Sequence, residues 1–157
     1  MQPQVKVNSK SLYDTDYQLW IDHTVAQLKS GDFSEVDVES LIEEVESLGR
    51  SDKRAILSYL IRLCEHFLKL QYWETERKNC FRGWKLEIIN FRLQIRLILK
   101  DSPSLKSHLH KNFEFAYQNA RQLFLNASEL DAKVIPEEPG FTLEQALNED
   151  WLPWQPE

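Results

Sequence analysis

The stretch that decides the fold runs from Val36 to Trp73 and reads VDVESLIEEVESLGRSDKRAILSYLIRLCEHFLKLQYW. Apolar residues recur in it at intervals of three and four, the spacing that places side chains on one face of an α-helix. Gly49 lies between its two halves and predicts that the first helix ends or kinks there. The pattern therefore predicts two consecutive helices, one from Asp37 to Gly49 and one from Asp52 to Trp73.

The first of these helices has the pattern of an amphipathic helix. Asp37 can cap its amino end by accepting hydrogen bonds from the unpaired backbone N–H groups of the first turn. The expected buried face consists of Val38, Leu41, Ile42, Val45 and Leu48. The opposite face is acidic and carries Glu39, Glu43, Glu44 and Glu46.

The second helix has two adjacent apolar stripes, one of Ile56, Leu60, Leu63, Phe67 and Leu70, and one of Leu57, Ile61, Cys64 and Leu68. An apolar face that wide needs several neighbouring elements to cover it, which predicts a central position in a bundle. The narrow polar strip that remains consists of Arg62, Glu65, His66 and Lys69.

Four further helices are expected on the same grounds. The first starts at Asp14 or Thr15 and ends at Gly31, and the polar residues 74–79 interrupt the pattern before the second. The second runs from Phe81 to Lys100 and is expected to bury Trp84, Ile88, Phe91, Ile95 and Ile98, with Ile89, Leu93, Leu97 and Leu99 widening that face. Ser102 and Pro103 start the third, which runs to Ala127 and is expected to pack through Leu105, Leu109, Phe113, Ala116, Tyr117, Ala120, Phe124 and Ala127. The fourth runs to Leu147 and opens with capping-box spacing at Thr142 and Gln145. The apolar end at residues 151–154 is expected to fold back on the bundle.

The fold class is thus all-α: a single domain over residues 12–153, built as a bundle of five main helices plus a short C-terminal helix. Residues 1–11 lack periodicity and are expected to form a loose N-terminal arm.

Composition excludes several other classes. The chain has only four glycines, and no Asn-Gly or Asp-Gly hairpin signal occurs. Charged residues interrupt every apolar run well short of a membrane span, so no membrane association is expected. Cys64 and Cys80 are too few for a disulfide framework. We therefore expect a reduced, cytoplasmic protein.

The net charge of −6 hides an asymmetry along the chain. Residues 1–49 carry three Lys/Arg against ten Asp/Glu, residues 77–100 carry seven against one, and residues 134–157 carry none against six. The basic segment has a candidate stripe on one helical face, formed by Arg82, Lys85, Arg92, Arg96 and Lys100. This stripe could bind a nucleic-acid backbone. Internal or oligomeric salt bridges with the acidic row 39–46 are the favoured interpretation, because the protein as a whole is acidic.

A metal site is the main catalytic alternative, with Glu43, Glu46 and His66 as its ligands. Carboxylates and imidazole at helical spacing can hold iron, manganese or zinc in a bundle. However, the Glu-x-x-His pair of di-iron bundles is absent, and Glu65 and His66 are adjacent in sequence and diverge on a helix. No metal and no cofactor are therefore predicted.

The order of the motifs resembles a bacterial, largely cyanobacterial family of helical proteins catalogued as domain of unknown function number twenty-nine. The resemblance rests on residues 13–17 (YDTDY) with Trp20, 41–50 (LIEEVESLGR), His66, 68–69, 71–72, Trp84, 101–105 (DSPSL), 116–117, 120–121 and 141–145 (FTLEQ). It covers residues 12–153 and implies an all-helical bacterial domain with no established activity to transfer.

The leading functional hypothesis is a non-enzymatic module that binds another protein or a second copy of itself. The alternatives are a metal-dependent hydrolase or nuclease using Glu43, Glu46 and His66, and a nucleic-acid binder using the basic stripe. No catalytic residues can be assigned. The candidate functional cluster is Glu43, Glu46, Arg50, His66, Lys69 and Arg92, if these side chains converge in the fold.

Overall fold

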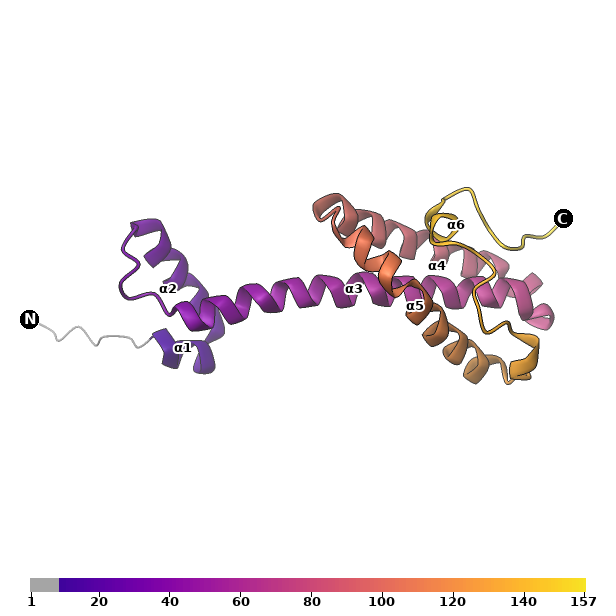
Figure 1. Ribbon diagram of the computed structural model, residues 1–157, viewed down its shortest axis with the longest axis horizontal. Coiled ribbons are helices and arrows are strands. Elements are labelled where there is room, and N and C mark those ends of the chain that lie inside the picture. Colours follow the sequence, from indigo (N-terminus) through magenta and orange to yellow (C-terminus); the bar gives the residue numbers. More distant parts are fainter. Residues whose placement is uncertain (1–8) are drawn as a thin grey trace, which may run out of the picture. The chain divides into compact units, whose positions relative to one another are not determined.

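The computed structural model describes residues 9–157, and all regular structure within that range is helical (Figure 1). The elements are α1 (Ser9–Thr15), α2 (Tyr17–Ser30), α3 (Val38–Tyr72), α4 (Glu74–Asp101), α5 (Leu105–Ser128), the 3-10 helix η1 (Ala132–Val134) and α6 (Leu143–Leu147). The predicted all-α class is confirmed. Of the predicted N-terminal arm, residues 1–8 lie outside the described residues, and the chain is helical from Ser9.

The chain divides into two compact units, residues 1–50 and residues 51–157. Helix α3 contributes to both, because its first 13 residues belong to the first unit and the remainder to the second. The expectation of one domain over residues 12–153 stays a prediction.

The predicted break at Gly49 is wrong, since α3 passes through this residue without interruption. Gly49 does not have a positive φ, unlike Gly31, and a methyl group added to it would meet no other atom within 4 Å. Glycine lowers helix stability without forbidding the helix, and here the hydrogen-bonded turns on both sides continue through it. Two predicted helices are therefore one.

The first unit is organised around Trp20, which is almost fully buried. The rings of Tyr13 and Tyr17 contact it, Tyr13 edge-on at 4.8 Å and Tyr17 stacked at 6.1 Å between ring centroids. Both tyrosine hydroxyls donate to the carboxylate of Glu44 on α3. These contacts attach α1 and α2 to the first part of α3.

Local capping sets the ends of the helices in this unit. Asp16, not the predicted Asp14 or Thr15, caps α2 by accepting from the backbone N–H of Leu19. Gly31 ends α2 in the left-handed conformation, as predicted. Asp37 accepts from both the backbone N–H and the hydroxyl of Ser40, so its predicted role at the start of α3 is confirmed.

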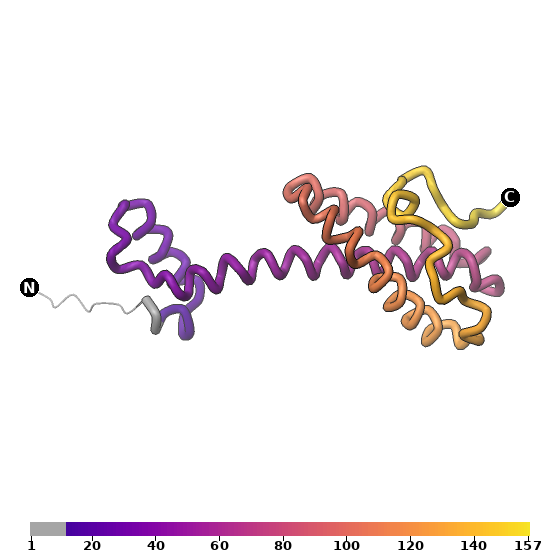
Figure 2. Tube along the Cα trace, viewed as in Figure 1, coloured from indigo at the N-terminus to yellow at the C-terminus, as the bar shows by residue number. Residues whose placement is uncertain are grey.

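The second unit has its core on the second part of α3 (Figure 2). All five residues of the first predicted stripe are fully buried, as are Cys64 and Leu68 of the other. Helix α4 covers them with Ile88, Phe91 and Ile95. Helix α5 buries six of the eight residues predicted on its inner face: Leu105, Leu109, Ala116, Tyr117, Ala120 and Phe124. Phe113 is partly buried and Ala127 is exposed. The central position of this part of α3 is confirmed.

The C-terminal segment packs back on this core, also as predicted. Phe141 and Trp151 both lie against the ring of Phe67, at 5.1 and 5.2 Å between centroids. Trp154 contacts the ring of Phe81 and the guanidinium of Arg77. The predicted capping box at the start of α6 is present, with Thr142 and Gln145 exchanging side-chain and backbone hydrogen bonds.

Two boundaries differ from the sequence expectation. Residues 74–79 were expected to interrupt the helical pattern. Instead, α4 begins at Glu74, and only Trp73 separates it from α3. Ser102 and Pro103, expected to start the next helix, instead follow the end of α4, and α5 begins at Leu105.

Arg92 of α4 fastens the C-terminal segment to the core. Its side chain is buried and lies over the ring of Phe67, with 5.3 Å between the guanidinium carbon and the ring centroid. The guanidinium donates to the carbonyl of Ala146 at 2.8 Å and to that of Trp151 at 2.7 Å, with longer contacts to the carbonyls of Gln145 and Glu149. A cation at the carboxyl end of α6 is favoured by the helix dipole. Desolvation lowers the pKa of Arg92 to about 10.

The Arg92→Met substitution should destabilise the protein by about 3 kcal/mol, because it removes the hydrogen bonds that the guanidinium donates to the carbonyls of Ala146 and Trp151. Urea unfolding followed by circular dichroism measures the change. Arg96→Met on the same helix is the matched control and should cost under about 0.5 kcal/mol, since Arg96 is exposed. Equal losses for the two variants would contradict this account of Arg92.

The Gly49→Ala substitution should stabilise α3 by about 1 kcal/mol, since alanine favours an unstrained helix interior and the added methyl group meets nothing. Backbone hydrogen exchange of residues 45–53 should become slower. Faster exchange in this segment would show that the helix does end or distort at Gly49.

Candidate functional site

The six residues of the candidate cluster do not all belong to one unit. Glu43, Glu46 and Arg50 lie in the first unit and His66, Lys69 and Arg92 in the second. Within the first unit, Glu46 and Arg50 form an exposed ion pair at 3.8 Å, a geometry that contributes little to stability. The role of the six residues as one site stays a prediction.

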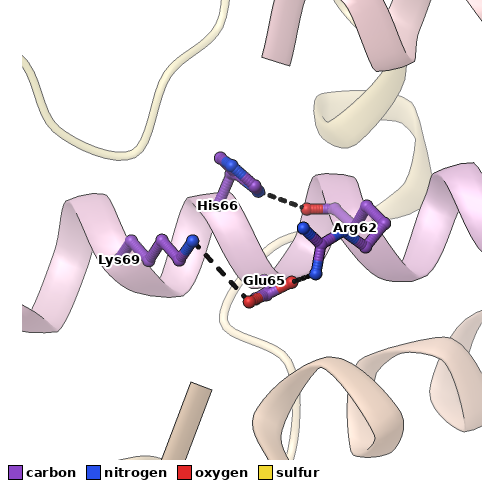
Figure 3. Close-up of polar contacts among 4 residues, drawn as sticks. All are labelled: Arg62, Glu65, His66 and Lys69. Carbon is purple, nitrogen blue, oxygen red and sulfur yellow. Dashed lines mark hydrogen bonds and ion pairs between the residues drawn. The ribbon is translucent and has the colours of Figure 1, made fainter. Parts of the chain in front are cut away.

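The second part of α3 carries a compact polar network around Glu65 (Figure 3). The Glu65 carboxylate is almost fully buried and pairs with Arg62 at 2.6 Å and with Lys69 at 3.7 Å. The ammonium group of Lys69 also lies 5.8 Å from the centroid of the Trp84 ring. A buried carboxylate needs such partners, because an unpaired charge away from water is costly.

His66 is buried beside this network. The hydrogen on Nδ1 is donated to the Arg62 carbonyl at 2.8 Å, and the edge of the ring meets Phe91. Burial lowers the pKa of His66 to about 4, and the positive charge of Lys69 contributes in the same direction. The polar strip of this helix is therefore divided: Glu65 and His66 are buried, whereas Arg62 is exposed. His66 is a packed, hydrogen-bonded core histidine.

The potential metal ligands do not gather in the described part of the chain. No group of three or more His, Cys, Asp or Glu side chains there could hold a metal ion. The two exposed glutamates, Glu43 and Glu46, belong to the first unit, whereas His66 is a buried residue of the second. The geometry thus supplies no observation in favour of the Glu43–Glu46–His66 site.

The basic stripe of α4 is divided between the surface and the interior. Arg82, Lys85, Arg96 and Lys100 are exposed, while Arg92 is buried against the C-terminal segment. The guanidinium of Arg96 pairs with the carboxylate of Glu149, and the ammonium group of Lys85 lies over the Phe81 ring. Four of the five residues of the predicted stripe therefore remain on the surface of α4. Their use in nucleic-acid binding stays a prediction.

An exposed apolar stripe on α3 overturns one expectation. Val38, Ile42, Val45 and Leu48, here called the α3 stripe, were predicted to be buried, but each is between 53% and 61% exposed. Leu41, beside them, is partly buried. The periodicity correctly predicted an amphipathic helix, but it could not show that α1 and α2 leave most of its apolar face uncovered.

A second exposed apolar stripe lies on α4. Leu86, Ile89, Leu93 and Leu97, here called the α4 stripe, are between 37% and 58% exposed. The expectation that Ile89, Leu93 and Leu97 widen the buried face of this helix is wrong. The buried face of α4 is the narrower one of Ile88, Phe91 and Ile95.

A groove of about 410 Å³ adjoins the α4 stripe. Ile89 and Leu93 form its apolar wall, and its polar rim includes Arg96, Glu149 and Asp150. Rows of large apolar side chains with a charged rim are the usual composition of a protein-binding surface.

A second surface hollow, also of about 410 Å³, lies between α3 and α5 in the second unit and is mainly apolar. It is lined by Arg54, Leu57, Ser58, Ile61, Arg62, Asn119, Gln122 and Leu123. Leu57 and Ile61 belong to the apolar row Leu57, Ile61, Cys64 and Leu68 predicted from sequence, and both are only partly buried. The hollow therefore lies where the neighbouring helices do not fully cover this wide apolar face.

The stability of the protein should fall between pH 6.5 and pH 4, because His66 is held neutral in the folded state while the unfolded chain takes up a proton. The stabilisation is fully present above pH 6.5 and decreases as the pH falls toward the folded pKa. At pH 4.5 the loss relative to pH 7 should be about 2 kcal/mol.

Urea unfolding of the wild type and of His66→Gln at both pH values tests this expectation. The variant should lose less stability than the wild type on acidification, whereas the difference between the two proteins should stay constant between pH 7 and pH 8. The same acid loss in both proteins would contradict the assignment to His66.

In the described part of the chain, none of the helices combines the length and the apolarity required to cross a membrane. No curated protein and no solved structure matches the sequence. Residues 12–152 match the family described as Domain of unknown function DUF29. Since the match spans far more than half of the sequence, the chain belongs to the DUF29 family.

Proposed function

We propose that this chain is a non-enzymatic protein-interaction module. The observation that carries the proposal is the exposure of the α3 and α4 stripes, eight large apolar side chains in two helical rows. Scattered apolar residues on a surface need no explanation, but contiguous rows of them commonly mark binding surfaces. Burial of such rows by a partner would remove apolar area from water, the main favourable contribution to association.

The charges around the two rows support the same proposal. Glutamates accompany the α3 stripe and lysines and arginines accompany the α4 stripe. Charged residues at the edge of an apolar patch select the partner and speed association. We place this function in the cytoplasm, supported by the free thiols of Cys64 and Cys80.

Polar substitutions within the stripes should abolish binding and spare the fold. The test variants are Ile42→Gln/Val45→Gln on α3 and Ile89→Gln/Leu93→Gln on α4. Because these side chains contribute little to either core, the free energy of unfolding should change by under about 0.5 kcal/mol per site. The matched controls are Glu43→Gln and Glu87→Gln, exposed residues on the same two helices.

Binding is measured in two ways: by the mass of the purified chain in solution, and by quantitative capture of crosslinked partners from the source cells. A complex that forms with the wild type and both controls, and is lost in a stripe variant, supports the proposal. Complexes that persist in both stripe variants, or losses of several kcal/mol in their stability, would overturn it.

A further inference from the structure

The two exposed stripes match each other in spacing. The apolar positions of the α3 stripe are 38, 42, 45 and 48, at intervals of four, three and three. The second row has positions 86, 89, 93 and 97, at intervals of three, four and four. Intervals of three and four are those by which two helices pack side by side. Each row covers about 15 Å of helix at 1.5 Å per residue, so one could lie along the other.

Acidic residues border the α3 stripe on both edges. Asp37 and Glu44 lie along one edge, held by Ser40 and by the two tyrosines. Glu39 and Glu46 lie along the other edge and are exposed. The stripe is thus an apolar strip between two acidic borders.

Basic residues lie at both ends of the α4 stripe and along one of its edges. Arg82 lies one turn before Leu86, and Lys100 continues the row one turn after Leu97. Lys85 and Arg96 lie along one edge, and all four cations are exposed. The only acidic side chain between residues 77 and 100 is Glu87, which lies on the opposite edge. The edge of Lys85 and Arg96 is therefore complementary in charge to the acidic borders of the α3 stripe.

A symmetric pairing would lose this complementarity. Two α3 stripes would bring carboxylates against carboxylates along the seam, and two α4 stripes would bring cations against cations, both of which are unfavourable. A mixed pairing combines apolar contact with opposite charges, since an edge of glutamates meets an edge of lysine and arginine. We propose that the chain binds a second copy of itself by docking the α3 stripe of one copy on the α4 stripe of the other.

The edges of the stripes also give the direction of the pair. One edge of each stripe carries the residues that directly precede stripe residues in the sequence, and the other edge carries those that directly follow them. In a parallel helix pair, the preceding edge of one helix faces the following edge of the other, as in the e and g contacts of parallel coiled coils. Parallel docking therefore sets Glu39 and Glu46 opposite Lys85 and Arg96. If Val38 of one copy and Leu86 of the other lie at the same height along the helix pair, Glu46 lies within one helical turn of Arg96 of the other copy.

This inference rests on the proposed function and names its partner. If two copies exchange the contact reciprocally, a closed dimer forms with two equivalent contacts; a contact that is not reciprocal adds copies without limit. Sedimentation velocity from micromolar to millimolar protein should show masses above that of one chain. The association should weaken with salt, which screens the charged borders.

Charge reversal with complementation is the decisive test. Glu46→Lys and Arg96→Glu should each weaken self-association about tenfold, through like charges at the seam. An equimolar mixture of the two variants should associate to within about threefold of the wild type, because opposite charges meet again at every contact.

Two controls isolate the interface. Glu43→Lys makes the same charge change on the far face of α3 and should weaken association less than about twofold. Glu149→Gln removes the ion pair of Arg96 without altering the α4 stripe and should have a similarly small effect. Circular dichroism and urea unfolding confirm that each variant is folded.

Three results would overturn the inference. The first is a monomer at every concentration. The second is a mixture of the two variants that associates no better than either variant alone. The third is a Glu46→Lys variant that associates more tightly than the wild type, which would indicate a symmetric pair of α3 stripes. A monomer that still captures another protein through its stripes would leave the proposed function standing. A monomer with no stripe-dependent partner would remove both.

Discussion

The burial of the second part of α3 is the constraint on which the second unit depends. A helix that is apolar over most of its circumference cannot be covered by one neighbour, since a single packed helix covers only about a third of its surface. Helices α4 and α5 cover two sides, and the segment after residue 135 covers part of what they leave. The same coverage encloses Glu65 and His66, whose polar atoms must then be satisfied by Arg62 and Lys69.

Burial has the same consequence at Arg92. Once the C-terminal segment lies over α4, the guanidinium can no longer reach water, and backbone carbonyls replace the water it loses. No carboxylate takes part, so the attraction depends on peptide dipoles and on the end of α6. Two features therefore hold the segment on the core. The aromatic cluster of Phe67, Phe141 and Trp151 contributes buried apolar area, and Arg92 contributes directional hydrogen bonds.

Sequence periodicity predicted the helices and the inner faces of α3 and α5 because those faces are wide and strongly apolar. It failed where burial depends on partners far along the chain. Val45 and Ile89 fit a buried pattern as well as Leu63 does, yet they are exposed, and Arg92 fits a surface stripe and is buried. Periodicity reports which residues share a face but not what covers that face.

The continuity of α3 through Gly49 also has a kinetic consequence. Starting a helix is its slow and unfavourable step, because several residues must be ordered before the first hydrogen bond forms, whereas extension adds one bond per residue. Residues 38–50 are few, include a glycine, and find no extensive core of their own. Once residues 51–72 have formed in the folded core, the amino-terminal turns can grow from that existing end. Residues 51–72 therefore offer the amino-terminal turns of α3 a helical end to extend, so those turns need no separate nucleation step.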